Sequence, residues 1–401
     1  MSLNTAPALN LVPWGVYAPA VVTGAISSPQ GLAGPQSAAS AVINAAVDVQ
    51  NSGAAPDAFS VAMRVLDAGG AVLATGSASG GALAPGGWAR VAITLTLANV
   101  TLWSVSTPAL LTVATTLTAA SAGSVDAANV TIGVRSAIFD ANAGLVLNGI
   151  PMQIQGFSQH QDFGGLGTAV PRRVQQYRVQ SLKGIGATGW RTAHNPVNSD
   201  LLALTDELGM LVMAENRNLE RQVIGGTRGG ARLGARPDPQ NINMSAFPDP
   251  QYLLEASQMV LRDRNHPSII MWSLCNEGGC MQGREEGGVA ASAFKNTILN
   301  IDSSRPITAN SEDYPGDTLT RITDIEAFSY NYDEYDAAHR KFPWKPVMGG
   351  ESASCVSDRG YYGALNVSAG TVPADDIGCV VSAWQSVGTR PWVIGNFAWT
   401  G

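Results

Sequence analysis

Short apolar runs rich in β-branched residues alternate with turn-forming clusters over residues 16–137. These runs favour strands, because they are brief and are bounded by glycine, proline, asparagine or aspartate. The expected strands are Ala41–Val49, Ser60–Leu66, Ala71–Thr75, Trp88–Leu97 and Ala109–Thr118. Many short strands at this spacing predict an immunoglobulin-like β-sandwich. We expect the glycine-rich segment Gly76–Gly87 to be a flexible loop.

From about Leu145 the pattern changes to buried strands that alternate with helices. The apolar runs expected to be strands are Met152–Phe157, Gly189–Thr192, Met210–Met213, Ser268–Leu274, Ile307–Ala309, Ile325–Tyr330, Pro346–Gly349 and Trp392–Trp399. Apolar residues at helical spacing lie between several of them, as at Leu201, Leu204 and Leu208. Another helix is expected to open at Pro171. Its apolar face would be Val174, Tyr177, Leu182 and Ile185. This repetition over 145–401 predicts a (β/α)8 TIM barrel.

The expected fold class is therefore multidomain β and α/β, a sandwich followed by a barrel. Residues 1–15 would be the remnant of a preceding domain or a tail. Within the barrel, Arg221–Pro250 is rich in glycine, proline and arginine. A loop of this length is usually functional or disordered. Two interpretations stay open for it: a mobile surface insertion, or a lid over the mouth of the barrel.

The charge balance limits the partners of this chain. A net charge of −7 argues against nucleic acid, because phosphate binding needs clustered lysine and arginine. No run approaches the roughly 18 apolar residues of a membrane span, so no membrane partner is expected. The start of the chain lacks the basic patch and apolar run of a signal peptide. Localisation stays open between the cytoplasm and a trimmed secreted protein, and homo-oligomerisation is left open.

Four cysteines are too few for a disulfide scaffold. Cys275 and Cys280 form a C-x4-C pair, but no second pair at zinc-site spacing accompanies them. Ordinary thiols or a single disulfide are therefore favoured over a metal site. We expect no cofactor.

Polar side chains follow nearly every predicted barrel strand, where the catalytic residues of a barrel project. Two of them are glutamates, Glu277 after the fourth strand and Glu351 after the seventh. Two carboxylates about 5 Å apart give a retaining glycosidase. Glu351 would attack the anomeric carbon, while Glu277 protonates the leaving oxygen and then activates water. After the eighth strand, Trp399 offers a ring face on which a sugar can rest.

Each candidate also has a structural alternative. A single glutamate at a strand end is more often a partner in an ion pair than a catalyst. His160 and His194 could be satisfied core histidines or could line a pocket, and Tyr330 could serve only in packing. Arg191, at the end of the second strand, would pair with a carboxylate and so orient or charge the nucleophile. The two glutamates are stronger catalytic candidates as a pair than singly, because both follow barrel strands.

The order of these blocks resembles glycoside hydrolase family 2, the family of β-galactosidases and β-glucuronidases. The segments that carry the resemblance are Gly156–His160, Trp190–Pro196, Asp206–Val212, Arg262–Ser268, Trp272–Glu277, Lys345–Glu351 and Phe397–Trp399. The resemblance covers about 145–401. In the sandwich, Leu102–Ser104 resembles a motif of the family's immunoglobulin-like domain.

The resemblance implies a role for each matching position. Asn276 would bind the 2-hydroxyl of the sugar, while Arg191 and Tyr330 would contact the nucleophile. The residues implied to line the sugar subsite are His160, His194 and Trp399. Some β-galactosidases of the family bind magnesium, but in this sequence no histidine stands in the stretch directly after Glu215, so their magnesium ligands have no clear counterpart. We therefore expect no metal site.

This sequence departs from the family pattern in several places. Members normally carry an N-terminal jelly-roll domain and a helix after the eighth strand, so truncation at both ends is expected. Gln161 stands where glutamate is commoner, and Thr400-Gly401 replaces a more acidic and aromatic ending. Both positions lie near the sugar and weaken the assignment of a substrate.

The sequence predicts a retaining exo-β-glycosidase that acts on glycosides or oligosaccharides with terminal β-linked sugars. β-Galactosides are the preferred substrates and β-glucuronides the alternative. A second class, a non-catalytic carbohydrate-binding fragment, is disfavoured because both carboxylates are retained.

Overall fold

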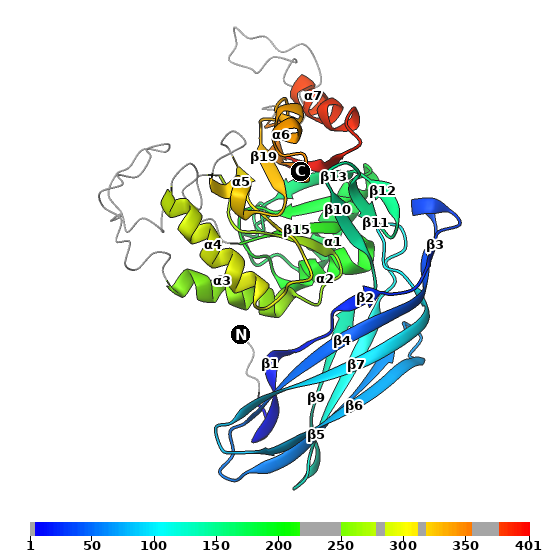
Figure 1. Cartoon of the computed structure of the whole chain (residues 1–401), viewed down its shortest axis with the longest axis vertical. Helices are drawn as coiled ribbons and strands as arrows, with labels where there is room; N and C mark the ends of the chain where they lie inside the picture. Colours follow the sequence, from blue (N-terminus) through cyan, green and yellow to red (C-terminus); the bar gives the residue numbers. More distant parts are fainter. Residues whose placement is uncertain (1–4, 217–249, 278–284, 312–317, 355–376) are drawn as a thin grey trace.

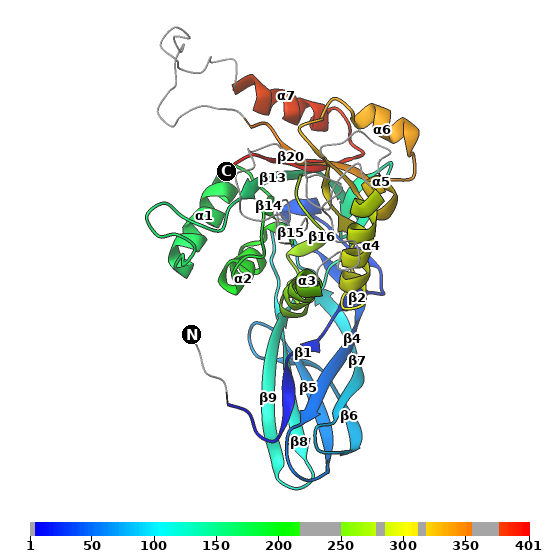
Figure 2. The same ribbon diagram turned by 90° about the vertical axis from the view of Figure 1, so that its left-hand side faces the viewer.

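The computed structural model describes residues 5–216, 250–277, 285–311, 318–354 and 377–401. An elongated β-sandwich and a barrel surrounded by helices lie end to end along the long axis (Figures 1 and 2). The predicted loop Arg221–Pro250 lies almost wholly outside the described residues, which resume where a helix begins at Pro250.

The sandwich packs two antiparallel sheets against one another. In the first, β4 (Ser37–Asn51) is central. Its partners are β1 (Leu9–Tyr17), β2 (Ala20–Val22), β3 (Ile26–Ser27) and β7 (Trp88–Thr101). The second sheet has the order β6 (Val72–Leu83), β5 (Asp57–Leu66), β8 (Leu111–Ala119) and β9 (Gly123–Ile132). A short 3-10 helix, Gly31–Ala33, lies between β3 and β4. Burial alternates along β8, because one face of the strand meets the shared apolar core. The predicted sandwich is therefore present.

The prediction of a flexible loop at Gly76–Gly87 is wrong. The strand β6 continues to Leu83, and its glycine-rich half pairs with β5. The small residues serve packing here: a Cβ at Gly80 would lie 2.2 Å from the ring of Phe59 on the neighbouring strand. Glycine in a strand interior often marks such a close approach.

Two further elements of the sandwich extend beyond the prediction. The strand β9 has no counterpart among the expected strands. In addition, β1 pairs with β4 through Leu9↔Asn51 and Tyr17↔Ala46, so the sandwich sheet crosses the proposed boundary at residue 16. The bounds 1–15, 16–137 and 145–401 stay a prediction for the domains.

A small three-stranded sheet leads from the sandwich into the barrel. Its strands are β10 (Ala137–Asp140), β11 (Gly144–Leu147) and β12 (Ile150–Met152). The parallel barrel strands follow as β13 (Ile154–Gln159), β14 (Gly189–Thr192), β15 (Leu211–Glu215), β16 (Ile269–Ser273), β17 (Ile307–Thr308), β18 (Asn310–Ser311), β19 (Glu326–Ser329), β20 (Val347–Ser352) and β21 (Val393–Ala398). β17 and β18 flank Ala309 and pair with β16 and β19, respectively. Together they take the place of one strand, and the ring has the eight positions of a TIM barrel.

Seven α-helices of the described chain accompany the barrel strands. They are α1 (Arg172–Gly184), α2 (Ser199–Leu208), α3 (Pro250–Asp263), α4 (Glu285–Leu299), α5 (Thr318–Ile322), α6 (Tyr335–Lys341) and α7 (Ile377–Gly388). The helix at Pro171 forms as predicted, with Pro171 as its N-cap, but its predicted apolar face is partly wrong. Tyr177 and Ile185 are 65% and 71% exposed, whereas Gln175 is buried beside Val179. The buried face is thus rotated relative to the apolar one.

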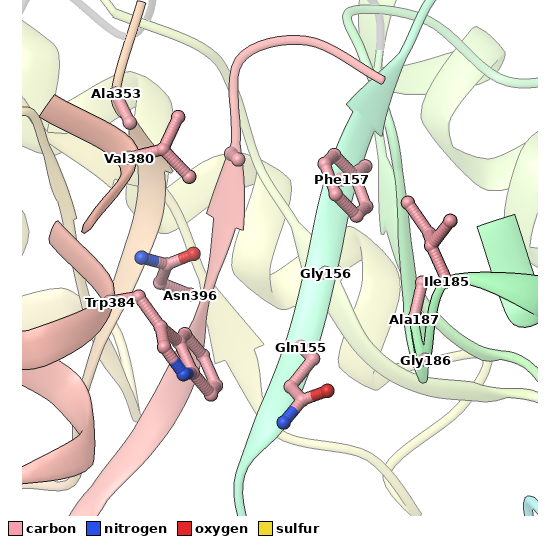
Figure 3. A pocket seen from close by; sticks show the side chains of 11 residues that line it. Gln155, Gly156, Phe157, Ile185, Gly186, Ala187, Ala353, Val380, Trp384 and Asn396 are labelled. Atoms are coloured by element: carbon pink, nitrogen blue, oxygen red, sulfur yellow. The ribbon is translucent and has the colours of Figure 1, made fainter. Parts of the chain in front are cut away.

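An apolar groove of about 190 Å³ lies between α1 and α7 on the outer wall of the barrel. Figure 3 shows Phe157 on one side of it and Trp384 on the other, with Asn396 of β21 beside Trp384. Successive side chains of a strand point to opposite faces of the sheet. Gln155 and Phe157 line this groove, whereas Ser158 of the same strand faces the interior of the barrel. The groove is therefore separate from the polar end of the barrel.

The sandwich and the barrel are joined by buried polar contacts as well as by apolar packing. Trp103 is fully buried, packs among barrel residues such as Leu211 and Ile270, and donates its indole N–H to the carbonyl of Asp206 at 2.9 Å. Arg135 donates to the carbonyls of Pro267 and Ile269. The interface thus has the character of a protein interior.

We expect the substitution Trp103→Phe to lower the free energy of unfolding by about 2 kcal/mol, because it removes buried volume and leaves the Asp206 carbonyl without its donor. Urea denaturation would measure the change. Trp88→Phe is the matched control: Trp88 is 54% exposed, so its substitution should change stability by only about 0.5 kcal/mol. Equal effects of the two substitutions would contradict the proposed interface role.

None of the described helices combines the length and the hydropathy that a bilayer-spanning segment needs.

The described cysteines, Cys275 and Cys379, both take part in disulfide bonds. Of the two alternatives favoured from the sequence, ordinary thiols or a disulfide, these two cysteines follow the second.

Candidate active site

Polar side chains gather at the carboxyl-terminal ends of the barrel strands. Arg191 belongs to β14, Glu215 ends β15, and Glu351 lies in β20. The other predicted site residues lie in the loops that follow strands of the same ring: His160, His194, Asn276, Glu277, Tyr330 and Trp399. Because parallel strands end at one rim, the barrel brings together residues that are far apart in sequence.

Arg191 is the centre of this group. Its side chain is fully buried, and its Nη1 donates to Oε2 of Glu351 at 2.5 Å and to the hydroxyl of Ser158 at 3.3 Å. Its Nε and Nη2 donate to Glu215 at 2.8–3.0 Å. The two buried carboxylates raise the pKa of Arg191 against the opposing effect of burial. The arginine therefore stays charged and ties Glu351 to the barrel wall.

Glu351 has a second anchor on its other oxygen. The hydroxyl of Tyr330 donates to Oε1 at 2.8 Å, and the backbone N–H of Tyr330 donates to the carbonyl of Glu351 at 2.7 Å. Tyr330 adopts a φ of 60°, an uncommon conformation that this pair of contacts supports. Burial, and then the hydrogen bond to Glu351, raise the pKa of Tyr330. The phenol thus remains a donor to the carboxylate.

The glycine before Glu351 is required by close packing. A Cβ at Gly350 would lie 1.8 Å from Oδ1 of Asn310 and 3.0 Å from Ala327 on the neighbouring strand. Asn310 in turn donates to Oδ1 of Asn276 at 3.3 Å. Any larger residue at position 350 would therefore disturb both the segment that carries Glu351 and the segment that follows β16.

The second glutamate, Glu277, is partly exposed beyond β16. Its charge, like that of Glu351, contributes to the raised pKa of Tyr330, after burial and the hydrogen bond from the phenol. Both carboxylates thus raise the pKa of the Tyr330 phenol. The separation of about 5 Å between them stays a prediction from the retaining mechanism.

Asn276 precedes Glu277 and is held by the same arginine. Its Oδ1 accepts from Nη2 of Arg191 at 2.7 Å as well as from Asn310. The assignment of oxygen and nitrogen in an amide follows from its hydrogen bonds. Because two donors meet at Oδ1, the orientation of the Asn276 amide is fixed.

An aromatic group borders these polar side chains. The rings of His194 and Trp399 stack at a centroid distance of 5.1 Å and an interplanar angle of 13°. His160 meets Trp399 edge-on at 5.1 Å. Burial, and then the neighbouring His194, lower the pKa of His160. The neutral imidazole and the indole thus form an apolar border beside the carboxylates.

Sequence reasoning missed Glu215 as a site residue, although it recognised a polar residue at the end of that strand. Arg191, His194 and Ser273 all contact the carboxylate oxygens of Glu215. No group of three or more histidine, cysteine or acidic side chains within the described residues is arranged to hold a metal ion. Within the described residues, the carboxylate oxygens of Glu215 are taken up by a guanidinium, an imidazole and a hydroxyl instead.

Comparison with known proteins agrees with this architecture. Residues 140–351 match the model for the TIM barrel domain of glycosyl hydrolases family 2, and residues 34–135 match a second model of that family. A β-galactosidase of Bacteroides ovatus is 29% identical over 384 residues, which cover 87% of this chain and 41% of that protein.

Two solved structures share the fold. A glycosyl hydrolase family 2 member from Bacteroides cellulosilyticus has a TM-score of 0.76 at 23% identity, over 98% of this chain and 46% of that one. A β-glucuronidase of Bacteroides uniformis has a TM-score of 0.74 at 20% identity, over 98% of this chain and 47% of that one. The chain thus spans less than half the length of each of these three proteins.

Fold and site define a (β/α)8-barrel protein with acidic, amide and aromatic side chains gathered at one rim. The barrel model covers more than half of the sequence, with its match to residues 140–351. The chain belongs to glycoside hydrolase family 2.

Proposed function

We propose that this chain carries the catalytic core of a retaining exo-β-glycosidase, with Glu351 as nucleophile and Glu277 as general acid and base. The observation that carries the proposal is the double anchoring of Glu351. Arg191 donates to one oxygen and Tyr330 to the other, while the charge of Glu277 acts on the same phenol. A carboxylate held through both oxygens keeps its direction, which nucleophilic attack requires.

The reaction follows as a double displacement. Glu351 attacks the anomeric carbon and forms a covalent glycosyl ester, while Glu277 gives its proton to the leaving oxygen. Glu277, now ionised, takes a proton from water, which attacks the same carbon and releases Glu351. The phenol of Tyr330 and the guanidinium of Arg191 hold the departing carboxylate in line for both steps.

We propose that the remaining predicted residues bind the sugar. The amide of Asn276, whose oxygen is held by Arg191, would donate from its nitrogen to the 2-hydroxyl. The stacked rings of His194 and Trp399, with His160 at their edge, would bear against the C–H face of the sugar. An apolar wall beside charged groups suits a neutral pyranose.

Terminal β-galactosides are the substrates that we favour. The similarity to a β-galactosidase of Bacteroides ovatus over most of this chain supports them. β-Glucuronides are the alternative, since a β-glucuronidase of Bacteroides uniformis shares the fold. A non-catalytic carbohydrate-binding role is a second class of function, and the anchoring of Glu351 argues against it, because binding alone needs no oriented nucleophile.

Hydrolysis of chromogenic aryl β-galactoside, β-glucuronide and β-mannoside by the full-length natural protein tests this proposal. We expect the galactoside to give the highest kcat/KM, and NMR of the released sugar to show the β-anomer first. If only the glucuronide is cleaved, the proposed substrate changes to β-glucuronides, and the proposed mechanism stands. Release of the α-anomer, or no hydrolysis of any of the three, would contradict the proposed function.

A further inference from the structure

Glu215 is a fully buried carboxylate that the proposed reaction does not use. It ends β15, beside Arg191 on the adjacent strand β14. Its Oε1 contacts Nδ1 of His194 at 2.9 Å, and its Oε2 accepts from the hydroxyl of Ser273 at 3.0 Å. A buried charge with this many donors is a built feature of the site, because burial without partners would be costly.

Glu215 and Glu351 divide the guanidinium of Arg191 between them. Glu215 takes the edge formed by Nε and Nη2, while Glu351 takes Nη1. A guanidinium is a rigid planar fork. When one carboxylate grips two of its nitrogens, the plane is fixed and the direction of the third is fixed with it. The contact at Glu215 therefore determines where Nη1 presents its proton to Glu351.

The two carboxylates also share one positive charge. The charge of Arg191 and a hydrogen bond from His194 hold the pKa of Glu215 below its ordinary value, in spite of the opposing effect of burial. Glu215 is therefore ionised and offsets much of the charge on Arg191. Glu351 is then bound by an arginine whose positive charge is already shared with a second buried carboxylate.

Glu215 also orients the imidazole of His194. A carboxylate that faces Nδ1 favours the proton on that nitrogen. Nε2 of the same ring lies 4.0 Å from Oε2 of Glu351. One buried side chain thus orients both the cation and the imidazole that stand next to the nucleophile.

We propose that Glu215 is a positioning and charge-balancing residue for Glu351, acting through Arg191 and His194. This inference rests on the proposed glycosidase function. The titratable and charged groups that face this pair are Arg191, His194, Tyr330, Glu277 and His160. Glu215 itself does not contact the substrate.

The test compares Glu215→Gln with the control Glu207→Gln, a surface glutamate paired with Arg172. We expect Glu215→Gln to lower kcat about 10²-fold with little change in KM. The acidic limb of the kcat/KM profile should move to lower pH, because the full charge of Arg191 then acts on Glu351. Labelling of Glu351 by a 2-deoxy-2-fluoro glycoside, followed by mass spectrometry, should slow in parallel. Glu207→Gln should match the natural protein.

Glu215→Asp keeps the charge but shortens the side chain. It should leave the acidic limb in place and still lower kcat, which separates charge balance from positioning. If Glu215→Gln does not fold, Ser273→Ala decides instead, since it removes one donor to Glu215 and should lower kcat more mildly. Unchanged kcat and an unchanged acidic limb in a folded variant would overturn the inference. An inactive natural protein would instead overturn the proposed function.

Discussion

Substituting glutamine for Glu351 is expected to lower kcat for aryl glycoside hydrolysis by roughly 10⁴-fold or more, the scale seen when an enzyme loses its nucleophile. The amide cannot form the glycosyl ester, and it carries no charge to stabilise the cationic transition state. Arg191 and Tyr330 would still hold the side chain, so the loss should appear in kcat more than in KM. Steady-state kinetics on the substrate that the natural protein prefers would measure it.

The same variant should remain fully folded. In the natural protein two buried carboxylates, Glu215 and Glu351, share the single charge of Arg191, and the substitution makes one of them neutral. The thermal midpoint should therefore be unchanged or slightly raised. Glu277→Gln offers a contrast, because substrates with good leaving groups do not need its proton and should retain more activity. Activity of Glu351→Gln close to that of the natural protein would refute its assignment as nucleophile.

The barrel could be predicted because its strands are buried on both faces and appear in sequence as unbroken apolar runs. Gly189–Thr192 was predicted with the bounds that the structure gives it. The ends of these runs located Glu277, Glu351 and Trp399, since every barrel strand delivers its last side chains to one rim. Strand order then explains why Arg191 meets Glu351, 160 positions away in the sequence.

The errors have equally specific causes. The second half of β6 was missed because glycine is weak in strands, and its use there depends on the ring of Phe59 across the sheet. The apolar face of α1 was misassigned because Gln175 is buried while Tyr177 is exposed. Residue type alone does not show either contact. Tertiary context decided both outcomes.

Glu215 shows a different limit. Its position at a strand end was visible in the sequence, but a glutamate there has several possible partners. Only the convergence of Arg191, His194 and Ser273 on its oxygens distinguishes a charge-balancing group from a metal ligand. The sequence shows which residues lie at the rim of the barrel. Only the folded structure shows that Glu215 and Glu351 share the single charge of Arg191.

That sharing predicts the largest stability effect in the barrel. Replacing Arg191 with methionine is expected to lower the free energy of unfolding by about 3–5 kcal/mol, because two buried carboxylates then lose their shared cation. With roughly 2–4 °C per kcal/mol in a domain of this size, the thermal midpoint should fall by on the order of 10 °C. Calorimetry and urea denaturation would measure both quantities.

The effect of Arg191→Met should depend on pH in a defined direction. In the natural protein the pKa of Glu215 is lowered by Arg191 and His194, so its contribution to stability is present above the unfolded value near 4.3 and is lost as pH falls. Without the arginine, burial would favour the protonated acid, and stability would fall as pH rises. The unfolding curves of the two proteins should therefore lie far apart at pH 7 and converge toward pH 4.

A double variant isolates the cause. Arg191→Met combined with Glu215→Gln removes one of the two opposed acids, so it should be more stable at pH 7 than Arg191→Met alone. Such non-additivity is expected of residues in one charge network. A double variant that is no more stable than the single one, or a loss of stability that is the same at pH 4 and pH 7, would mean that Arg191 acts through packing. The electrostatic account of Glu215 and Glu351 would then fail.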